Sequence, residues 1–391
     1  MVVLMSNKKL DYKIKKNITL LPSMLQSVER AIADLRRGSI VIVAGNEHAL
    51  LVQAAEGLTR EALARISALS KENPSLLITA RRASILGLIN DPRGAVRISL
   101  ADEITAEVVR MMADPTGPQP QKGLTALSIA RIDQDTAPGA AELGAIEIAK
   151  LSRLLPATVV ATIPKEKLSY LSSWAESESL LAVELEDIRL YRSSEARTLK
   201  NVSEAEVPLS ESETTKIMAF RPPDGSREHL AIVIGELNTE QAVLVRIHSE
   251  CFTGDLLASL RCDCGDQLRG AIAEINKAGG GVLLYMAQEG RGIGLVNKLR
   301  AYQLQDKGYD TLDANEQLGF DYDERIYQPA VEILNQLDIS KIRLLTNNPQ
   351  KVRALEDEGI EVFERVAHSF PSNRHNERYM ATKQGRGGHL L

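Results

Sequence analysis

The chain has 391 residues, of which 44% are hydrophobic and 25% are charged, and its formal net charge is −5. This length predicts two or three domains that each bury a core, and the composition is that of an ordinary globular protein. The acidic balance argues against a general polyanion binder, because nucleic-acid-binding domains usually carry a basic excess.

The N-terminal segment "MVVLMSNKKLDYKIKKN" has a short apolar run in front of its lysines. A secretory signal has the reverse order and a longer apolar part. No run in the chain approaches the about 20 apolar residues that a membrane span needs. We therefore expect a cytoplasmic protein with neither membrane nor nucleic-acid partners.

Helix and strand patterns alternate through the first half of the chain. The stretch "MLQSVERAIADLRRG" has apolar residues at helical spacing and a stop at Gly38. The run "SIVIVAG" (39–45) predicts a short buried strand, and "ATVVATI" predicts another. Further helices are predicted in "LTREALARISALS" and "ELGAIEIAKLSRLL". This alternation indicates an α/β or α+β domain.

Residues 193–228 are polar and weakly periodic, which predicts a connector. Strands are then predicted in "LAIVIGEL", "QAVLVRIHSE" and "GVLLYM", and helices in "QLRGAIAEINKAGGG" and "LVNKLRAYQLQDKG". The stretch "KIRLLTNNPQKVRALEDEG" predicts strand, loop and helix, with Asn348 as N-cap and Pro349 in the first turn. The predicted fold class is α/β (α+β), with two domains that each have a mixed sheet and packed helices.

The cysteines of the chain are Cys251, Cys262 and Cys264. One intervening residue suits two thiolates on one metal ion better than a disulfide, and Cys251 would supply a third. Three thiolates leave one position of a tetrahedral Zn²⁺ open, as in catalytic zinc sites, where a bound water has its pKa lowered to about 7. Two alternatives stay open, namely a structural zinc closed by His248 and buried cysteines without a metal.

The surrounding motifs "RIHSECFTGD" and "LRCDCGDQL" resemble GTP cyclohydrolase II, the family that opens guanine to begin riboflavin synthesis. The resemblance continues through "YMAQEGRGIGLVNKLRAYQLQDKGYDT", "ANEQLGFDYDERIY" and "LLTNNPQKV", and resumes at "NERYMATK". It implies a cyclohydrolase domain over residues 206–391 and a homodimer. It also implies zinc-dependent opening of GTP to 2,5-diamino-6-(5-phosphoribosylamino)pyrimidin-4(3H)-one, formate and pyrophosphate.

The resemblance also implies roles for individual residues. The zinc ligands fall on the three cysteines, and the catalytic positions fall on Asp323, Arg325 and Tyr302. Asp323 would accept a proton and Arg325 would attack the α-phosphate, although a protonated guanidinium there could instead clamp that phosphate. Mg²⁺ is expected with the pyrophosphate. The implied GTP contacts are Arg246, Ile247, His248, Ser249, Glu250, Gln267, Glu289, Gly290, Arg291, Thr311, Thr346 and Lys351.

Residues from about 25 to 190 more loosely resemble 3,4-dihydroxy-2-butanone-4-phosphate synthase, through "SVERAIADLRRGSIVIV" and "ISLADEITAEVVRMM". This resemblance implies a synthase-like domain over residues 1–200. That family has a run of acidic residues where this chain has "AGNEHALLVQAAE". Ala49, Leu50 and Leu51 offer no oxygen ligand to magnesium. Glu142 survives in "GAAELGAIEIA", and His48 is interpreted as a surface residue, with a remnant ligand as the alternative. We predict an inactive, structural or regulatory domain whose removal leaves the chemistry intact.

Two rival functions stay open. A paralogue could act on another nucleotide or in pyrimidine catabolism, which the unusual first half favours. A nucleotide-sensing protein could bind GTP without turning it over.

Overall fold

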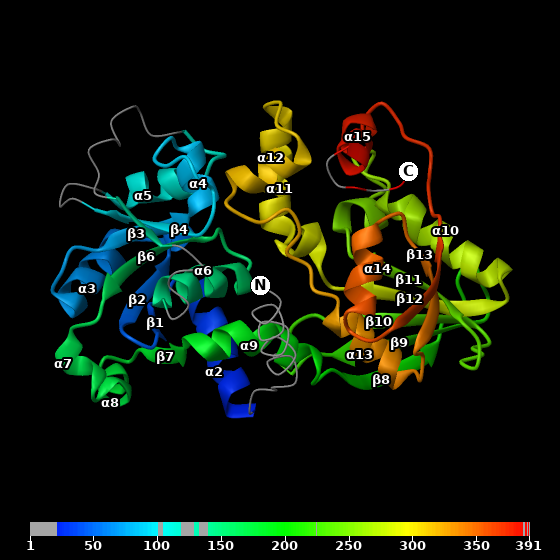
Figure 1. The fold of residues 1–391 in the computed structure, drawn as a ribbon, viewed down its shortest axis with the longest axis horizontal. Coiled ribbons are helices and arrows are strands. Elements are labelled where there is room, and N and C mark those ends of the chain that lie inside the picture. The colour runs from blue at the N-terminus through cyan, green and yellow to red at the C-terminus, as the bar shows by residue number, and fades with distance from the viewer. Residues whose placement is uncertain are drawn as a thin grey trace, which may run out of the picture. The chain divides into compact units, whose positions relative to one another are not determined.

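A computed structural model describes residues 22–100, 105–118, 129–132, 140–223 and 225–385, with Gly388 and Leu390. The chain forms two compact units, which are Met1–Ser194 with Val296–Glu324, and Glu195–Leu295 with Arg325–Leu391. Each unit has a mixed sheet with packed helices (Figure 1), which confirms the predicted fold class. The domains 1–200 and 206–391 stay predictions based on resemblance. The segment 296–324 belongs to the same compact unit as the N-terminal residues.

The first unit is built on a seven-stranded sheet with the order β5-β4-β3-β6-β2-β1-β7. Strand β1 pairs antiparallel with β2 and parallel with β7. Ala49, Leu50 and Leu51 begin the buried strand β2, so apolar packing occupies the positions where the resembled family has acidic ligands. The strands are β1 (Val41–Ala44), β2 (Ala49–Ala54), β3 (Ser75–Thr79), β4 (Ala95–Ser99), β5 (Ile129–Ile132), β6 (Ala157–Thr162) and β7 (Leu181–Glu184).

Helices cover both faces of this sheet because its strands are apolar on both sides. Ile42 packs with α3, α4, α5 and Trp174 of α8, whereas Val41 and Val43 pack with α2, α6 and α9. The helices are α2 (Pro22–Arg36), α3 (Arg60–Ser70), α4 (Ala80–Ile85), α5 (Ala106–Ala113), α6 (Ala141–Leu151), α7 (Lys165–Leu168), α8 (Leu171–Ser177), α9 (Leu185–Ala196), α11 (Leu295–Asp306), α12 (Thr311–Gln317) and the 3₁₀ turn η1 (Ala55–Gly57).

The second unit has a seven-stranded sheet with the order β14-β13-β11-β12-β10-β9-β8. Strands β11, β12, β13 and β14 form a parallel block, and β10, β9 and β8 extend it antiparallel. The strands are β8 (Lys200–Glu206), β9 (Thr215–Arg221), β10 (His229–Gly235), β11 (Val243–Ser249), β12 (Gly280–Met286), β13 (Lys341–Leu345) and β14 (Glu361–Val366).

The second sheet is also covered on both faces. Helices α13 and α14 pack on one face around Phe220 and Val245, and α10 packs on the other around Leu244. Asn348 caps α14 by accepting the backbone N–H of Gln350, with Pro349 in the first turn, as predicted. The helical elements are α10 (Cys264–Lys277), α13 (Gln328–Gln336), α14 (Pro349–Glu356), α15 (Glu377–Gly385), the π-helical turn η3 (Phe252–Leu256) and the 3₁₀ turn η4 (Glu289–Gly292).

The prediction of a connector over residues 193–228 is wrong. Strands β8 and β9 pair there as the edge of the second sheet, and Phe220 of β9 is fully buried. The polar sequence misleads because every side chain of β8 is exposed, so this edge strand lacks the alternation of a half-buried strand.

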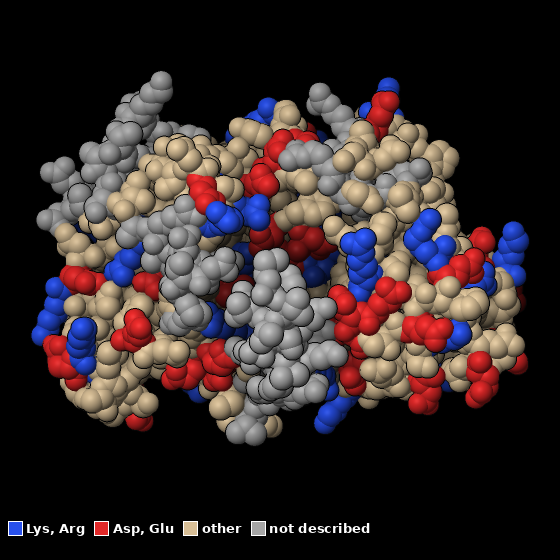
Figure 2. All heavy atoms as spheres, in the orientation of Figure 1, with Lys and Arg blue, Asp and Glu red and all other residues tan. Residues whose placement is uncertain are grey.

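Acidic and basic side chains are interspersed over the face of the second unit that is drawn at the right of Figure 2. On β13 and β14 they pair, Lys341 with Glu361 and Arg343 with Glu364. In the part of the chain that the structure describes, no helix has both the length and the apolarity to cross a bilayer.

Candidate metal and nucleotide site

Three of the predicted motifs follow neighbouring parallel strands of the second unit. "RIHSEC" covers the end of β11, "EGRG" follows β12, and "TNNPQK" follows β13. Because parallel strands end at the same edge of a sheet, the three loops gather at one edge. The crossover helix α10 begins at Cys264 and places the "RCDC" motif beside the end of β11.

The three cysteine sulfurs form one cluster. Their Sγ atoms lie within 4.8 Å of one another, and the Cys251 and Cys262 sulfurs are 3.7 Å apart. Cys251 is buried, while Cys262 and Cys264 are partly buried. This cluster could hold a metal ion that prefers sulfur ligands.

Two glycines allow the cysteine loops to approach so closely. A Cβ at Gly254 would lie 2.8 Å from the Cys262 sulfur and 3.0 Å from the Cys251 sulfur. A Cβ at Gly265 would lie 2.5 Å from the Gly254 carbonyl oxygen. Neither glycine was predicted to belong to the site, although each lies within three positions of a cysteine in "RIHSECFTGD" or "LRCDCGDQL".

The crowding of the thiols shifts their ionisation. Contact with Cys251 raises the pKa of Cys262 to about 11. Contacts with the other two thiols, together with burial, raise the pKa of Cys264 well above its usual value. Without a cation the sulfurs oppose one another's ionisation, whereas a bound metal ion favours the thiolates.

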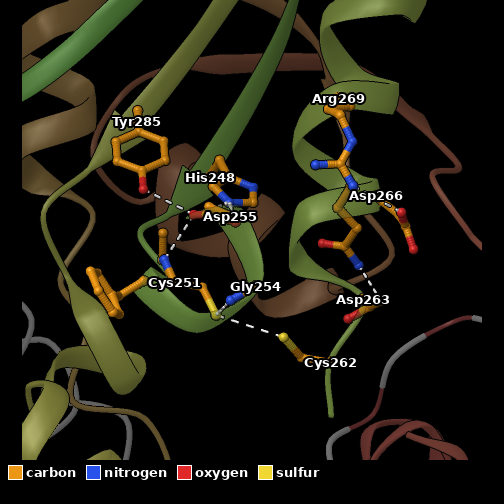
Figure 3. A network of polar contacts seen from close by, with 12 residues as sticks. His248, Cys251, Gly254, Asp255, Cys262, Asp263, Asp266, Arg269 and Tyr285 are labelled. Carbon is orange, nitrogen blue, oxygen red and sulfur yellow. Dashed lines mark hydrogen bonds and ion pairs between the residues drawn. The ribbon is translucent and has the colours of Figure 1, made fainter. Parts of the chain in front are cut away.

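A buried polar network holds the backbone of Cys251 (Figure 3). The Cys251 N–H and the Tyr285 hydroxyl donate to Asp255 Oδ2, at 2.8 and 2.9 Å. His248 Nε2 lies 3.1 Å from Asp255 Oδ1, and the His248 ring stacks on Tyr285 at 5.6 Å between centroids. Burial lowers the pKa of His248, although Asp255 opposes this, so the ring is neutral at neutral pH. Asp255 was not predicted to belong to the site, although it ends the motif "RIHSECFTGD".

Arg246 and Gln267 belong to a second buried network. Arg246 donates to the Leu345 carbonyl oxygen at 2.8 Å and to Gln267 Oε1 at 2.5 Å, and Gln267 Nε2 donates to Asp263 Oδ2. Burial lowers the pKa of Arg246 to about 10, so it remains charged at neutral pH. Among the described residues, Arg246 Nε and His248 Nδ1 have no hydrogen-bond partner, so both atoms could bind water or a ligand.

The turn η4 is fixed to the cysteine loop by Glu289. Its carboxylate accepts the backbone N–H groups of Phe252 and Gly290, at 2.7 and 2.8 Å. Gly290 and Arg291 have positive φ values of 62° and 60°. Successive residues in such a conformation can turn backbone N–H groups toward an anion.

Further predicted contacts lie at the same edge of the sheet. Lys351 is buried on α14 and donates to the Ile247 carbonyl oxygen at 3.0 Å, and Thr346 is buried after β13. Arg325 donates to Ser249 Oγ at 3.2 Å. Glu250 is buried and pairs with Arg227, a residue that lies outside the predicted motifs.

The remaining predicted residues belong to the first unit. Tyr302 lies on α11, with Lys298 Nζ 5.8 Å from its ring centroid. Thr311 begins α12, and Asp323 lies in the irregular stretch after it. The structure groups these three with the N-terminal residues and groups the cysteines with the second unit.

The interpretation of His48 as a plain surface residue is wrong. Its side chain is 28% exposed, and its Nε2 lies 3.0 Å from Oε2 of the buried Glu142. The other carboxylate oxygen of Glu142, Oε1, lies 3.6 Å from the Arg97 guanidinium. The carboxylate raises the pKa of His48. The folded sheet makes this pair, because the two residues are far apart in the sequence and meet where β2 begins beside α6.

The chain is similar to several known proteins. The family model for GTP cyclohydrolase II matches residues 200–367. The GTP cyclohydrolase-2 of Azospirillum brasilense is 50% identical over 372 residues, which covers 94% of each chain. The riboflavin biosynthesis protein RibBA of Chlorobium phaeovibrioides is 33% identical over 407 residues, covering 94% of this chain and 97% of that one. The crystal structure of RibBX, a two-domain 3,4-dihydroxy-2-butanone 4-phosphate synthase from A. baumannii, covers 88% of this chain at 20% identity with a TM-score of 0.35.

Fold and site together define a two-unit α/β enzyme with a three-thiol site that could hold a metal ion, beside loops suited to an anion. The similarity to curated relatives extends over nearly the whole chain. The chain belongs to the GTP cyclohydrolase II family.

Proposed function

We propose that this enzyme uses zinc to open the imidazole ring of GTP by hydrolysis. The products would be formate, pyrophosphate and 2,5-diamino-6-(5-phosphoribosylamino)pyrimidin-4(3H)-one, in the first step of riboflavin biosynthesis. The observation that carries the proposal is the group of three cysteine sulfurs within 4.8 Å of one another, at the sheet edge where the family's nucleotide motifs gather. Family membership supports GTP as the substrate.

The donor set fits Zn²⁺. With Zn–S bonds of about 2.3 Å, two sulfurs of a tetrahedral site lie about 3.8 Å apart. The Cys251 and Cys262 sulfurs are separated by 3.7 Å. In the part of the chain that the structure describes, the grouped candidate ligand atoms are the three cysteine sulfurs and include no histidine nitrogen, which would leave one position for water. When bound, the metal would supply a water that is acidic enough to ionise near neutral pH.

The residues of the chain would hold the substrate around that position. Buried Arg246 would keep its charge and has one free donor, Nε, for the nucleotide. Glu289 would fix the Gly290–Arg291 turn, so that backbone N–H groups and the Arg291 guanidinium meet phosphate oxygens. Gln267 is held by Arg246 and Asp263 and would present its amide at the sheet edge.

The contacts of Arg325 favour a role in clamping the α-phosphate over a role as a nucleophile. Arg325 donates to Ser249 Oγ, which holds a positive charge at the end of β11. A charged guanidinium is suited to stabilise the α-phosphate but is a poor nucleophile. Three roles remain predictions from resemblance. These are Asp323 as proton acceptor, Tyr302 as a further catalytic residue and Thr311 as a GTP contact.

The test is an assay of purified protein with GTP, Zn²⁺ and Mg²⁺ that follows formate, pyrophosphate and the pyrimidine product. The wild type should release formate and pyrophosphate, and Cys262→Ser should lose bound zinc together with formate release. Release of neither product by zinc-loaded wild type would refute the proposal. Turnover of another nucleotide in preference to GTP would favour the paralogue, and tight GTP binding without turnover would favour a sensor.

Three associated properties are proposed from the family alone. These are a homodimer, a magnesium ion on the phosphates and a cytoplasmic location. Light scattering after size-exclusion chromatography checks the first, and the dependence of pyrophosphate release on Mg²⁺ checks the second. Fractionation of the source cells checks the third.

A further inference from the structure

The inserted segment, residues 296–324, has an unexpected position in the fold. In sequence it lies within the 200–367 stretch that matches the cyclohydrolase family. In the structure it packs with the N-terminal residues as part of the first compact unit. It carries the predicted site residues Tyr302, Thr311 and Asp323.

Arg300 makes the first anchor of the inserted segment. Its guanidinium lies 3.0 Å from Glu56 Oε2 and 3.2 Å from Asp114 Oδ2. All three side chains are largely shielded from solvent, being 18%, 22% and 26% exposed. One turn earlier on α11, Asn297 donates to the Arg153 carbonyl oxygen at 3.0 Å. A planar guanidinium between two carboxylates fixes direction as well as distance.

Lys150 makes the second anchor. Its two acidic partners lie on either side of Asp323 in the sequence. Its Nζ lies 2.8 Å from Asp321 Oδ2 and 2.7 Å from Glu324 Oε1. Lys150 and Glu324 are each only 10% exposed. Glu324 Oε1 also accepts the Asp321 backbone N–H at 2.9 Å, so one lysine ties both ends of the turn that contains Asp323. Arg81 adds a third charge contact, 2.9 Å from Asp321 Oδ1.

Close packing supports the charged anchors. Phe320 is fully buried directly before Asp321. Gly319 has a φ of 86°, and a Cβ there would lie 2.8 Å from Thr79 Oγ1 and 3.1 Å from Pro156. The turn is therefore seated against the end of β3 and the start of β6, and a side chain at position 319 would displace it.

We propose that the first unit is the platform that positions the inserted segment for GTP opening, with Lys150 and Glu56 as positioning residues. This inference rests on the proposed function. It gives a role to a unit whose β2 carries apolar residues where the resembled synthase has acidic ligands. It also differs from the sequence-based expectation that residues 1 to about 200 are dispensable for the chemistry. Small displacements of groups near a reacting centre can cost about 100-fold in rate.

The experiment uses the full-length, zinc-loaded enzyme and the variants Lys150→Met, Lys150→Arg and Glu56→Gln. The matched control is Lys167→Met, a lysine of the same unit that contacts the Trp174 ring and the Leu69 carbonyl oxygen. The readouts are kcat and KM for formate release, zinc content, and hydrogen exchange of peptides from 296–324 without GTP.

Lys150→Met should lower kcat/KM by about 10- to 100-fold and speed hydrogen exchange in the inserted segment, with zinc content unchanged. Lys150→Arg should keep kcat/KM and the hydrogen exchange of the inserted segment close to their wild-type values, because it keeps the positive charge. Glu56→Gln tests the other anchor, so the inference stays falsifiable if Lys150→Met does not fold. Lys167→Met should match the wild type.

Wild-type kinetics in both Lys150→Met and Glu56→Gln would overturn the inference, and so would unchanged exchange in both. A wild type that releases no formate would instead refute the proposed function. The platform role would then be tested by hydrogen exchange alone. Faster exchange of the inserted segment in Lys150→Met and Glu56→Gln would support this role, and unchanged exchange would refute it.

Discussion

Substitution of Gly254 by alanine should separate metal binding from folding. The added Cβ would lie 2.8 Å from the Cys262 sulfur, 2.9 Å from Cys264 Cβ and 3.0 Å from the Cys251 sulfur. The Cys262 sulfur would have to retreat by about 0.6 Å to reach the 3.4 Å at which ordinary contact begins. Metal–ligand distances tolerate only about 0.2 Å, so the methyl group should spread the sulfurs beyond a common zinc ion.

The expected result is a loss of zinc with the fold retained. Gly254→Ala should bind far less than the single equivalent of zinc expected for the wild type and should release no formate from GTP. Metal analysis of the purified protein and a competition titration with a chromogenic chelator measure the loss. Circular dichroism and the thermal midpoint of the zinc-free proteins show whether the second sheet is intact.

Gly385→Ala is the matched control, because a Cβ at that exposed helical position would meet no atom within 4 Å. It should keep wild-type zinc content and turnover. Full zinc occupancy with unchanged affinity in Gly254→Ala would refute the reasoning, since three sulfurs around one ion would then not need the space that the glycine leaves.

Three further predictions concern other parts of the molecule. Asp255→Asn should weaken zinc affinity by about 10- to 100-fold, because Asp255 accepts the Cys251 N–H. The control Asp266→Asn, which changes an exposed carboxylate paired with Arg269, should leave zinc affinity unchanged. Equal zinc affinities of the two variants would contradict a role of Asp255 in holding Cys251. Phe220→Ala should lower the free energy of unfolding by about 3–5 kcal/mol, measured by urea denaturation, whereas a true connector would lose almost nothing. Glu142 raises the pKa of His48, so this pair should stabilise the fold below the unfolded pKa of about 6.5 and stop doing so as pH rises through the folded pKa. The unfolding free energies of wild type and His48→Gln should therefore differ by up to about 1 kcal/mol at pH 6 and converge by pH 9, and a difference independent of pH would count against the pair.

Local patterns predicted several of the regular elements, because each of these signals is contained in a few neighbouring residues. The helix that Gly38 ends, the buried strand β1 and the Asn348 cap all formed as expected. Strand β8 was missed because an exposed edge strand carries no alternation, and only its pairing with β9 identifies it. The network of Asp255, His248 and Tyr285 was also missed, because Tyr285 comes from a neighbouring strand whose register with β11 places it beside His248.

By itself, the sequence determined which chemical groups this protein has. Three cysteines in short motifs supply the sulfur donors, and the surrounding motifs identify the GTP cyclohydrolase II family, because both depend on residue identity and order. Tertiary structure decided which groups meet. Parallel strand ends bring Cys251 and the loops after β12 and β13 to one edge, Glu142 finds His48 across the first sheet, and Lys150 holds the turn around Asp323. These contacts join residues distant in the chain, so they depend on packing and strand register, which no local pattern specifies.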